Sequence, residues 1–263
     1  MWAAYDDRRP FLIVMAALIA MTWLALWIWS ISPYARFLGH EGIGDLGSAF
    51  GGQYLALLGV FVAGWTLMTI AMMLPTSLPL VMLFHRLTRQ RSDRLRLVVS
   101  LIVGYLGVWV LFGGLAHLGD LFVHEAVEHS TWLKDNAWAV GAGAIMIAGI
   151  YQFTPLKYKC LDKCRSPLSF IAEHWRGSQH GVQAVRLGAH HGLFCIGCCW
   201  SLMMLMFVVG VGNVAWMLVL GSVMAVEKNM PWGSKISAPL GMALVGWGLV
   251  LCATATHSTP HLH

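Results

Sequence analysis

The sequence is poor in charged residues, which make up only 11% of its 263 positions, whereas 58% are hydrophobic. Soluble domains carry about 25% charged residues. This shortage excludes a water-exposed surface of ordinary composition. Lipid is therefore the expected surrounding for most of the chain, and the lipid bilayer is its first expected partner.

Several familiar motifs are also missing. The sequence has no phosphate-binding loop, no internal repeat and no composition shift that would mark a separate soluble domain. Its six cysteines lack the regular spacing of a secreted disulfide scaffold. The apolar run after Arg8-Arg9-Pro10 exceeds the core of a signal peptide and lacks a clear A-x-A cleavage site, which predicts a retained signal anchor. We expect one integral membrane domain over 1–263, no catalytic residues and no nucleic-acid partner, and an enzyme is the less favoured class.

Seven apolar stretches approach the length of about 20 residues that spans a bilayer. They are Phe11–Ile31, Tyr54–Phe84, Leu97–Leu121, Ala137–Phe153, Leu193–Val211, Val214–Val226 and Ile236–Ala253. The second is too long for one straight span, and Pro75 and Pro79 break or kink it. The sixth is short and only Gly212 and Asn213 separate it from the fifth. The expected fold is all-α, a polytopic transmembrane helix bundle of about seven spans, with six as the alternative.

Basic residues gather in alternate loops of this arrangement. They are Arg86, Arg89, Arg91, Arg94, Arg96, Lys157, Lys159, Lys163, Arg165, Arg176, Arg186, Lys228 and Lys235. The other loops, 32–53 and 118–136, hold only Arg36 and Lys134. Because short basic loops stay in the cytoplasm, we predict a multi-pass protein of the cell inner membrane with its N-terminus inside. The largest loop, 154–191, is then cytoplasmic, and Ser166-Pro167 within it predicts the start of a short interfacial helix.

The stretch HHGLFCIGCCWSLMMLM is the richest in metal-binding side chains. On an ideal helix, one face carries His191, Cys195, Cys198, Cys199 and Met206. Imidazole, thiolate and thioether are ligands that suit soft metals, Cu(I) above all. The alternative is that these cysteines act as small buried hydrophobes.

Two further groups of sulfur-containing residues are candidate metal ligands. Cys160 and Cys164 follow a C-x-x-x-C spacing in the cytoplasmic loop. They either join the first cysteine group in one site, form a separate station of a relay, or are ordinary loop residues. Met72 and Met73 precede Pro75, where broken backbone is tolerated if it lines a cavity. Their thioethers either pass a soft cation along or simply pack.

A second candidate metal site lies on the outer side. His117, Asp120, His124 and Glu128 fall within about 80° of one another on a helix. Imidazole and carboxylate suit Cu(II) or Zn(II), so zinc is possible at this outer group. The alternative is a polar helix end whose histidines and carboxylates pair in water at i, i+4 spacing.

Two polar features remain ambiguous from sequence. Glu227 lies at the inner end of the sixth stretch and is expected to pair with Lys228 or a histidine, or to be solvated. His257, His261 and His263 either add ligands on the outer side or belong to a disordered tail.

Four motifs together resemble a known family. They are AMMLPTSLPLVMLF, YQFTPLKYKCLDKCRSPLSF, HHGLFCIGCCWSLMMLMFVVGVGN and AVEKNMPWG, within about Tyr54 to Gly233. The family is domain of unknown function 2182, whose members are described as predicted metal-binding integral membrane proteins and in part as copper chaperones. The resemblance implies copper binding, delivery or insertion for a membrane copper enzyme. The alternatives are an assembly subunit that partners other subunits of a membrane complex, and a membrane thiol redox protein.

Overall fold

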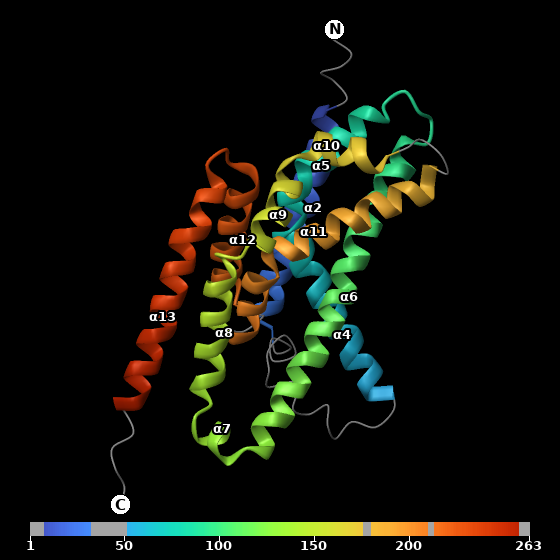
Figure 1. Cartoon of the computed structure of the whole chain (residues 1–263). Coiled ribbons are helices and arrows are strands. Elements are labelled where there is room, and N and C mark those ends of the chain that lie inside the picture. The colour runs from blue at the N-terminus through green and yellow to red at the C-terminus, as the bar shows by residue number, and fades with distance from the viewer. Residues whose placement is uncertain (1–7, 33–51, 176–179, 210–212, 258–263) are drawn as a thin grey trace, which may run out of the picture.

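The chain forms a bundle of helices (Figure 1). The computed structural model describes residues 8–32, 52–175, 180–209 and 213–257, and within these ranges no strand occurs. The elements are α2 (Arg8–Ser30), α4 (Gly52–Met72), α5 (Leu74–Leu87), α6 (Arg94–His129), α7 (Thr131–Asp135), α8 (Trp138–Tyr151), α9 (Pro155–Arg165), α10 (Pro167–His174), α11 (His180–Val209), α12 (Val214–Asn229), the 3-10 helix η3 (Gly233–Ile236) and α13 (Ser237–His257). The all-α prediction is confirmed.

Length and composition give four to six membrane spans among the described residues, a range that includes the predicted alternative of six but not the count of seven. Within the part of the chain that the structure describes, four helical segments are long and apolar enough, namely Arg9–Ser30, Arg94–His129, Gly181–Val208 and Gly233–Ala255. Two bent pairs, α4 with α5 and α8 with α9, raise the count to as many as six. The predicted sixth stretch lies in α12, which has 16 residues. At about 1.5 Å per residue, a helix of that length falls short of a hydrocarbon core of about 30 Å.

The second apolar stretch is broken at Met73, as its prolines predict. The axes of α4 and α5 differ by 67° on the two sides of this residue. Pro75 lies in the first turn of α5, where its missing N–H leaves no helical hydrogen bond unmade. The Met73 carbonyl accepts hydrogen bonds from Thr76 Oγ1 at 2.8 Å and from the Tyr105 hydroxyl at 3.4 Å. The irregular backbone is therefore satisfied inside the bundle rather than exposed to lipid.

Helices α6 and α11 approach each other very closely. A Cβ atom on Gly188 would lie 1.9 Å from the Leu101 carbonyl oxygen, and one on Gly104 would lie 2.0 Å from the Val185 carbonyl oxygen. Only glycine fits at either position, because any Cβ atom would overlap a carbonyl oxygen of the other helix. Small residues allow this close approach of helix backbones in membranes. This contact fixes α11, and with it the cysteine-rich stretch, against the long helix α6.

The segment 154–191 is mostly helical where the structure describes it. Thr154 caps α9 by accepting a hydrogen bond from the Lys157 backbone N–H at 3.3 Å. Helix α10 begins at Pro167 directly after Ser166, as predicted. Helix α11 already starts at His180, well before the apolar stretch that begins at Leu193. The predicted loop is thus a helical layer over one end of the bundle.

The two ends of the bundle carry different elements. In Figure 1, α5, α9, α10 and the start of α6 lie at one end, whereas α7 and the end of α13 lie at the other. The first end includes the basic helix α9, and Lys134 lies in α7 at the second. This separation agrees with the predicted alternation of basic loops. That the basic end faces the cytoplasm stays a prediction.

Candidate metal centre

The predicted face of α11 is buried in the bundle. His191 is 3% exposed and Cys198 is 1% exposed, while the exposed fraction of Cys195, Cys199 and Met206 is 0%. Helix α11 runs unbroken through Gly192 and Gly197. The five side chains share one face of α11, as the helical periodicity predicts, and the structure shows that this face is buried.

Sulfur atoms from three separate segments meet at this face. Cys199 Sγ lies 3.7 Å from Met73 Sδ at the break between α4 and α5. Cys198 Sγ lies 3.9 Å from Cys164 Sγ on α9. We call Met73, Cys164, Cys195, Cys198 and Cys199 the sulfur cluster. Its cysteines are all free thiols.

A lysine that sequence reasoning did not assign to the site enters the sulfur cluster. Lys228 Nζ donates to Cys195 Sγ at 2.9 Å and lies 3.9 Å from both Cys199 Sγ and Met73 Sδ. Its ammonium also donates to Thr76 Oγ1 at 3.2 Å. A buried charge is tolerated when it is paired and hydrogen-bonded. The ammonium thus offers the positive charge that would balance a thiolate here.

A second buried lysine has a different partner. Lys157 Nζ lies 2.7 Å from Glu227 Oε1 and 3.0 Å from Glu227 Oε2, and also donates to Gln152 Oε1. Ser237 Oγ donates to Glu227 Oε1 at 2.7 Å. The expectation that Glu227 pairs with Lys228 or a histidine, or is solvated, was wrong. Successive residues on a helix do not face each other, so Glu227 turns to α9 while Lys228 turns to the sulfur cluster.

Two of the thiols donate hydrogen bonds to a backbone carbonyl oxygen rather than converging on one point with the others. The thiols of Cys198 and Cys199 donate to the Cys195 carbonyl oxygen at 3.1 and 2.8 Å. The Tyr105 hydroxyl lies 3.1 Å from Cys195 Sγ. Across the described ranges, no three His, Cys, Asp or Glu side chains are placed as a metal ion would require. Binding at the sulfur cluster would need the thiols to rotate about their Cα–Cβ bonds.

Cys160 lies beside the sulfur cluster without joining it. A Cβ atom on Gly197 would lie 2.5 Å from Cys160 Sγ. The glycine therefore lets α9 rest on α11, and this packing brings Cys164 close to Cys198. Met72, the partner of Met73 in the sequence prediction, faces α12 instead, where a Cβ atom on Gly221 would lie 3.5 Å from Met72 Cγ.

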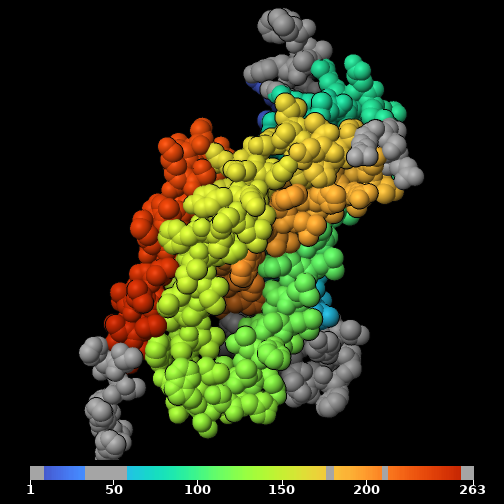
Figure 2. Space-filling view, in the orientation of Figure 1, coloured from blue at the N-terminus to red at the C-terminus, as the bar shows by residue number. Residues whose placement is uncertain are grey.

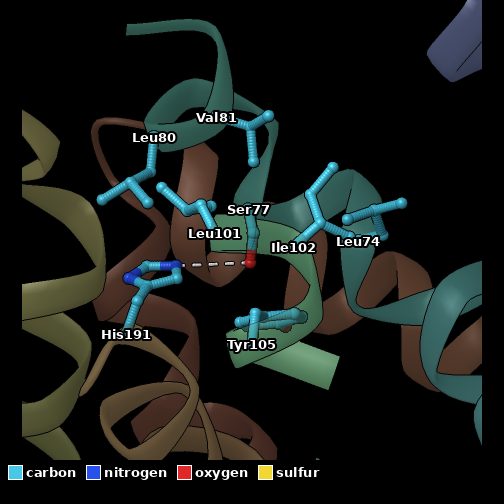
Figure 3. A pocket seen from close by; sticks show the side chains of 8 residues that line it. All are labelled: Leu74, Ser77, Leu80, Val81, Leu101, Ile102, Tyr105 and His191. Carbon is cyan, nitrogen blue, oxygen red and sulfur yellow. Dashed lines mark hydrogen bonds between the residues drawn. The ribbon is translucent and has the colours of Figure 1, made fainter. Parts of the chain in front are cut away.

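His191 points into an apolar pocket beside the sulfur cluster. Figure 3 shows its ring directed at Ser77, with Nε2 3.3 Å from Ser77 Oγ. The pocket is lined by Leu74, Ser77, Leu80, Val81, Leu101, Ile102, Tyr105 and His191. The Nδ1 atom of His191 has no hydrogen-bond partner among the described residues. The structure thus directs His191 toward α5 rather than toward the thiols.

The predicted outer ligands are divided between different surroundings. His117 is buried against the ring of Phe61, at 4.6 Å between centroids. His124 and Glu128 lie on an exposed face of α6, 3.5 Å apart. Helix α6 continues to His129, which lies 2.8 Å from Glu125. These contacts are the i, i+4 pairs of the alternative explanation.

Two of the outer residues line a cleft. Asp120 and His124 on α6 lie along a cleft of about 720 Å³, together with Met204 on α11 and residues of α8. Figure 2 shows the face on which α6 and α8 border this hollow. Asp120 and His124 therefore line the same cleft, whereas His117 is buried and does not line it. His257 ends α13, and His261 and His263 lie outside the described residues.

Comparison with known proteins gives one match. A family model with the description "PpoB2: Copper chaperone" matches residues 62–251, a range that contains the sulfur cluster and the cleft. No curated protein and no solved structure matches the chain.

Proposed function

Because the chain belongs to the PpoB2 family of copper chaperones, we propose that it carries Cu(I) as cargo on the sulfur cluster and passes it to a copper enzyme in the same membrane. The apolar helices support a membrane location. The family description supports copper as the metal, and the thiols and thioether of the sulfur cluster support Cu(I) as its oxidation state. Copper here is the cargo of the protein rather than a resident cofactor.

The single observation that carries this proposal is the meeting of sulfur atoms from distant segments. Cys198 and Cys164 are 34 positions apart in sequence and Cys199 and Met73 are 126 apart, yet their sulfur atoms lie 3.9 and 3.7 Å from each other. Thiolate and thioether ligands select Cu(I). Four thiols and one thioether offer several alternative ligand sets, which suits a protein that must accept the ion and release it.

The position of the sulfur cluster suggests a direction of transfer. Cys164 belongs to α9 at the basic end of the bundle, which we propose faces the reducing cytoplasm, where thiols stay free. Along α11, Cys199 is followed on the same face by the buried Met203 and Met206. Met204, the residue after Met203 on α11, lines the cleft together with Asp120 and His124. We assign that cleft to the release side, where copper, or zinc in its place, would meet oxygen and imidazole ligands.

Counting bound copper in purified protein tests this function. Wild type is loaded anaerobically with Cu(I) in detergent, beside a C195S/C198S/C199S variant and a C252S variant. Cys252 is a free, half-buried cysteine on α13, outside the sulfur cluster, and so controls for loss of any thiol. The triple variant should lose the bound copper and C252S should keep it. Equal copper in all three proteins would overturn the proposed site.

A further inference from the structure

Lys228 brings a fixed positive charge into the proposed cargo site. Its Nζ lies between three sulfur atoms, 2.9 Å from Cys195 Sγ and 3.9 Å from both Cys199 Sγ and Met73 Sδ. The hydrogen bond to Thr76 Oγ1 at 3.2 Å holds the ammonium in place. The ammonium thus touches the same sulfur atoms that would bind the ion.

No carboxylate in the described contacts neutralises this lysine. Glu227, its neighbour in sequence, is engaged by Lys157 at 2.7 Å and by Ser237 at 2.7 Å. Arg165 adds a guanidinium that donates to the Glu227 and Pro231 carbonyl oxygens nearby. The Tyr105 hydroxyl, 3.1 Å from Cys195 Sγ, is a polar neighbour of the sulfur cluster that is not a carboxylate. The charge of Lys228 is therefore left for the sulfur atoms and their cargo.

The sum of charges then depends on the valence of the ion. Lys228 Nζ contacts two cysteines, Cys195 and Cys199; as thiolates, these two add to zero with the ammonium and one monovalent cation. With a divalent cation, one positive charge remains uncompensated in a buried site. Such a charge is costly away from water, and charges interact strongly at these distances in a medium of low dielectric constant.

We propose that Lys228 is a specificity-determining residue, which makes the sulfur cluster accept monovalent thiophilic cations, Cu(I) or Ag(I), and reject divalent ones such as Zn(II) or Cd(II). This inference rests on the proposed function, because it assumes that the sulfur cluster is the cargo site. It deepens that function by explaining how thiols that would also suit Zn(II) could be kept for copper.

The test is a comparison of affinities in full-length protein in detergent. Cu(I), Ag(I) and Cd(II) are titrated in competition with a chromophoric chelator into wild type, K228Q, K228R and K235Q. Lys235 is exposed on η3 and gives a matched loss of one charge away from the sulfur cluster. The affinity for Cd(II) relative to Cu(I) should rise by at least about tenfold in K228Q. K228R and K235Q should keep the wild-type ratio.

The outcomes separate the two proposals. Cu(I) binding with an unchanged ratio in K228Q, or a ratio in K228R equal to that of K228Q, would overturn the role of Lys228 alone. A wild type that binds no Cu(I) would overturn the proposed function and this inference with it. If K228Q does not fold, a displacement experiment on the wild-type protein provides a second measurement. Excess Cd(II) should leave bound Ag(I) in place, and its displacement would contradict the inference.

Discussion

Two buried lysines, Lys157 on α9 and Lys228 on α12, have different partners. Lys157 neutralises Glu227, which is 70 positions away in sequence, whereas Lys228 turns to the sulfur cluster. The sequence predicted that Glu227 pairs with Lys228 or a histidine, or is solvated. This prediction was wrong because neighbours on a helix diverge, and because the true partner is set by the packing of α9 on α12.

Removing the charge of Glu227 should strongly destabilise the protein. In E227Q the ammonium of Lys157, whose side chain is 0% exposed, would be left without its counter-ion. Breaking a buried pair by removing one partner costs about 3–5 kcal/mol. Thermal unfolding in detergent measures the loss, and K157M/E227Q should recover part of it because no charge is then stranded.

The exposed pair of Lys163 and Glu173 provides the control. Lys163 Nζ donates to both carboxylate oxygens at 2.8 and 2.9 Å, and this hydrogen bonding lowers the pKa of Glu173. Exposed pairs contribute little to stability, because water and salt screen the two charges. E173Q should therefore unfold close to the wild-type temperature. A similar loss in E173Q and E227Q would contradict the assignment of Glu227 as a buried anchor.

Among the helices, the sequence predicted some features better than others. The break before Pro75 and the inward face of α11 follow from local rules, namely the missing proline donor and the helical period. Helix α9 was read as part of a polar loop, because its one buried face, Lys157, Cys160 and Leu161, exists only once α11 and α12 pack against it. The sulfur cluster was predictable in part, since Cys195, Cys198 and Cys199 share a helix, but the choice of Met73 over Met72 needed the fold.

The contact between α6 and α11 should not tolerate a methyl group. In G188A the new Cβ would lie 1.9 Å from the Leu101 carbonyl oxygen, whereas in G107A, also in a helix, nothing lies within 4 Å. Overpacking costs about 1–3 kcal/mol, and more where backbone must move. G188A should unfold well below wild type and G107A at or above it. Equal unfolding temperatures would contradict the close approach of these helices.

Helix α9 should contribute a ligand through Cys164 and none through Cys160. Cys164 Sγ lies 3.9 Å from Cys198 Sγ, whereas Cys160 packs against Gly197. Cu(I) affinity should fall in C164S and stay near wild type in C160S. If α9 and α11 form one site, the losses in C164S and C198S should be non-additive in the double variant. Additive losses would indicate two independent stations of a relay instead.

At the scale of the whole molecule, the sequence predicted which elements share an end but not how many helices cross the bilayer. The basic segments gather at the end formed by α5, α9 and α10, opposite α7. The count differs from seven because α12 is short, because the stretch Tyr54–Phe84 is bent by 67°, and because α9 follows α8 at an angle of 64°. A hydropathy profile gives the length of an apolar stretch but not the direction of its helix axis. It therefore does not reveal a bend within or next to the stretch.

The orientation can be tested with fusions to a reporter that is active only outside the cytoplasm. A fusion after Arg91, beyond α5, should be inactive, and one after Lys134 in α7 should be active, because basic loops remain inside. A reversed result would place the sulfur cluster near the outer face and overturn the proposed direction of transfer.

The central claim is that Cu(I) is bound by sulfur, and X-ray absorption at the copper edge of the loaded wild-type protein tests it most directly. The account predicts a nearest shell of sulfur atoms alone, retained in C252S and lost in C195S/C198S/C199S. A nearest shell of nitrogen or oxygen with the outer scattering of imidazole would place the ion on histidines such as His124 or His191, and would contradict the sulfur cluster as the cargo site.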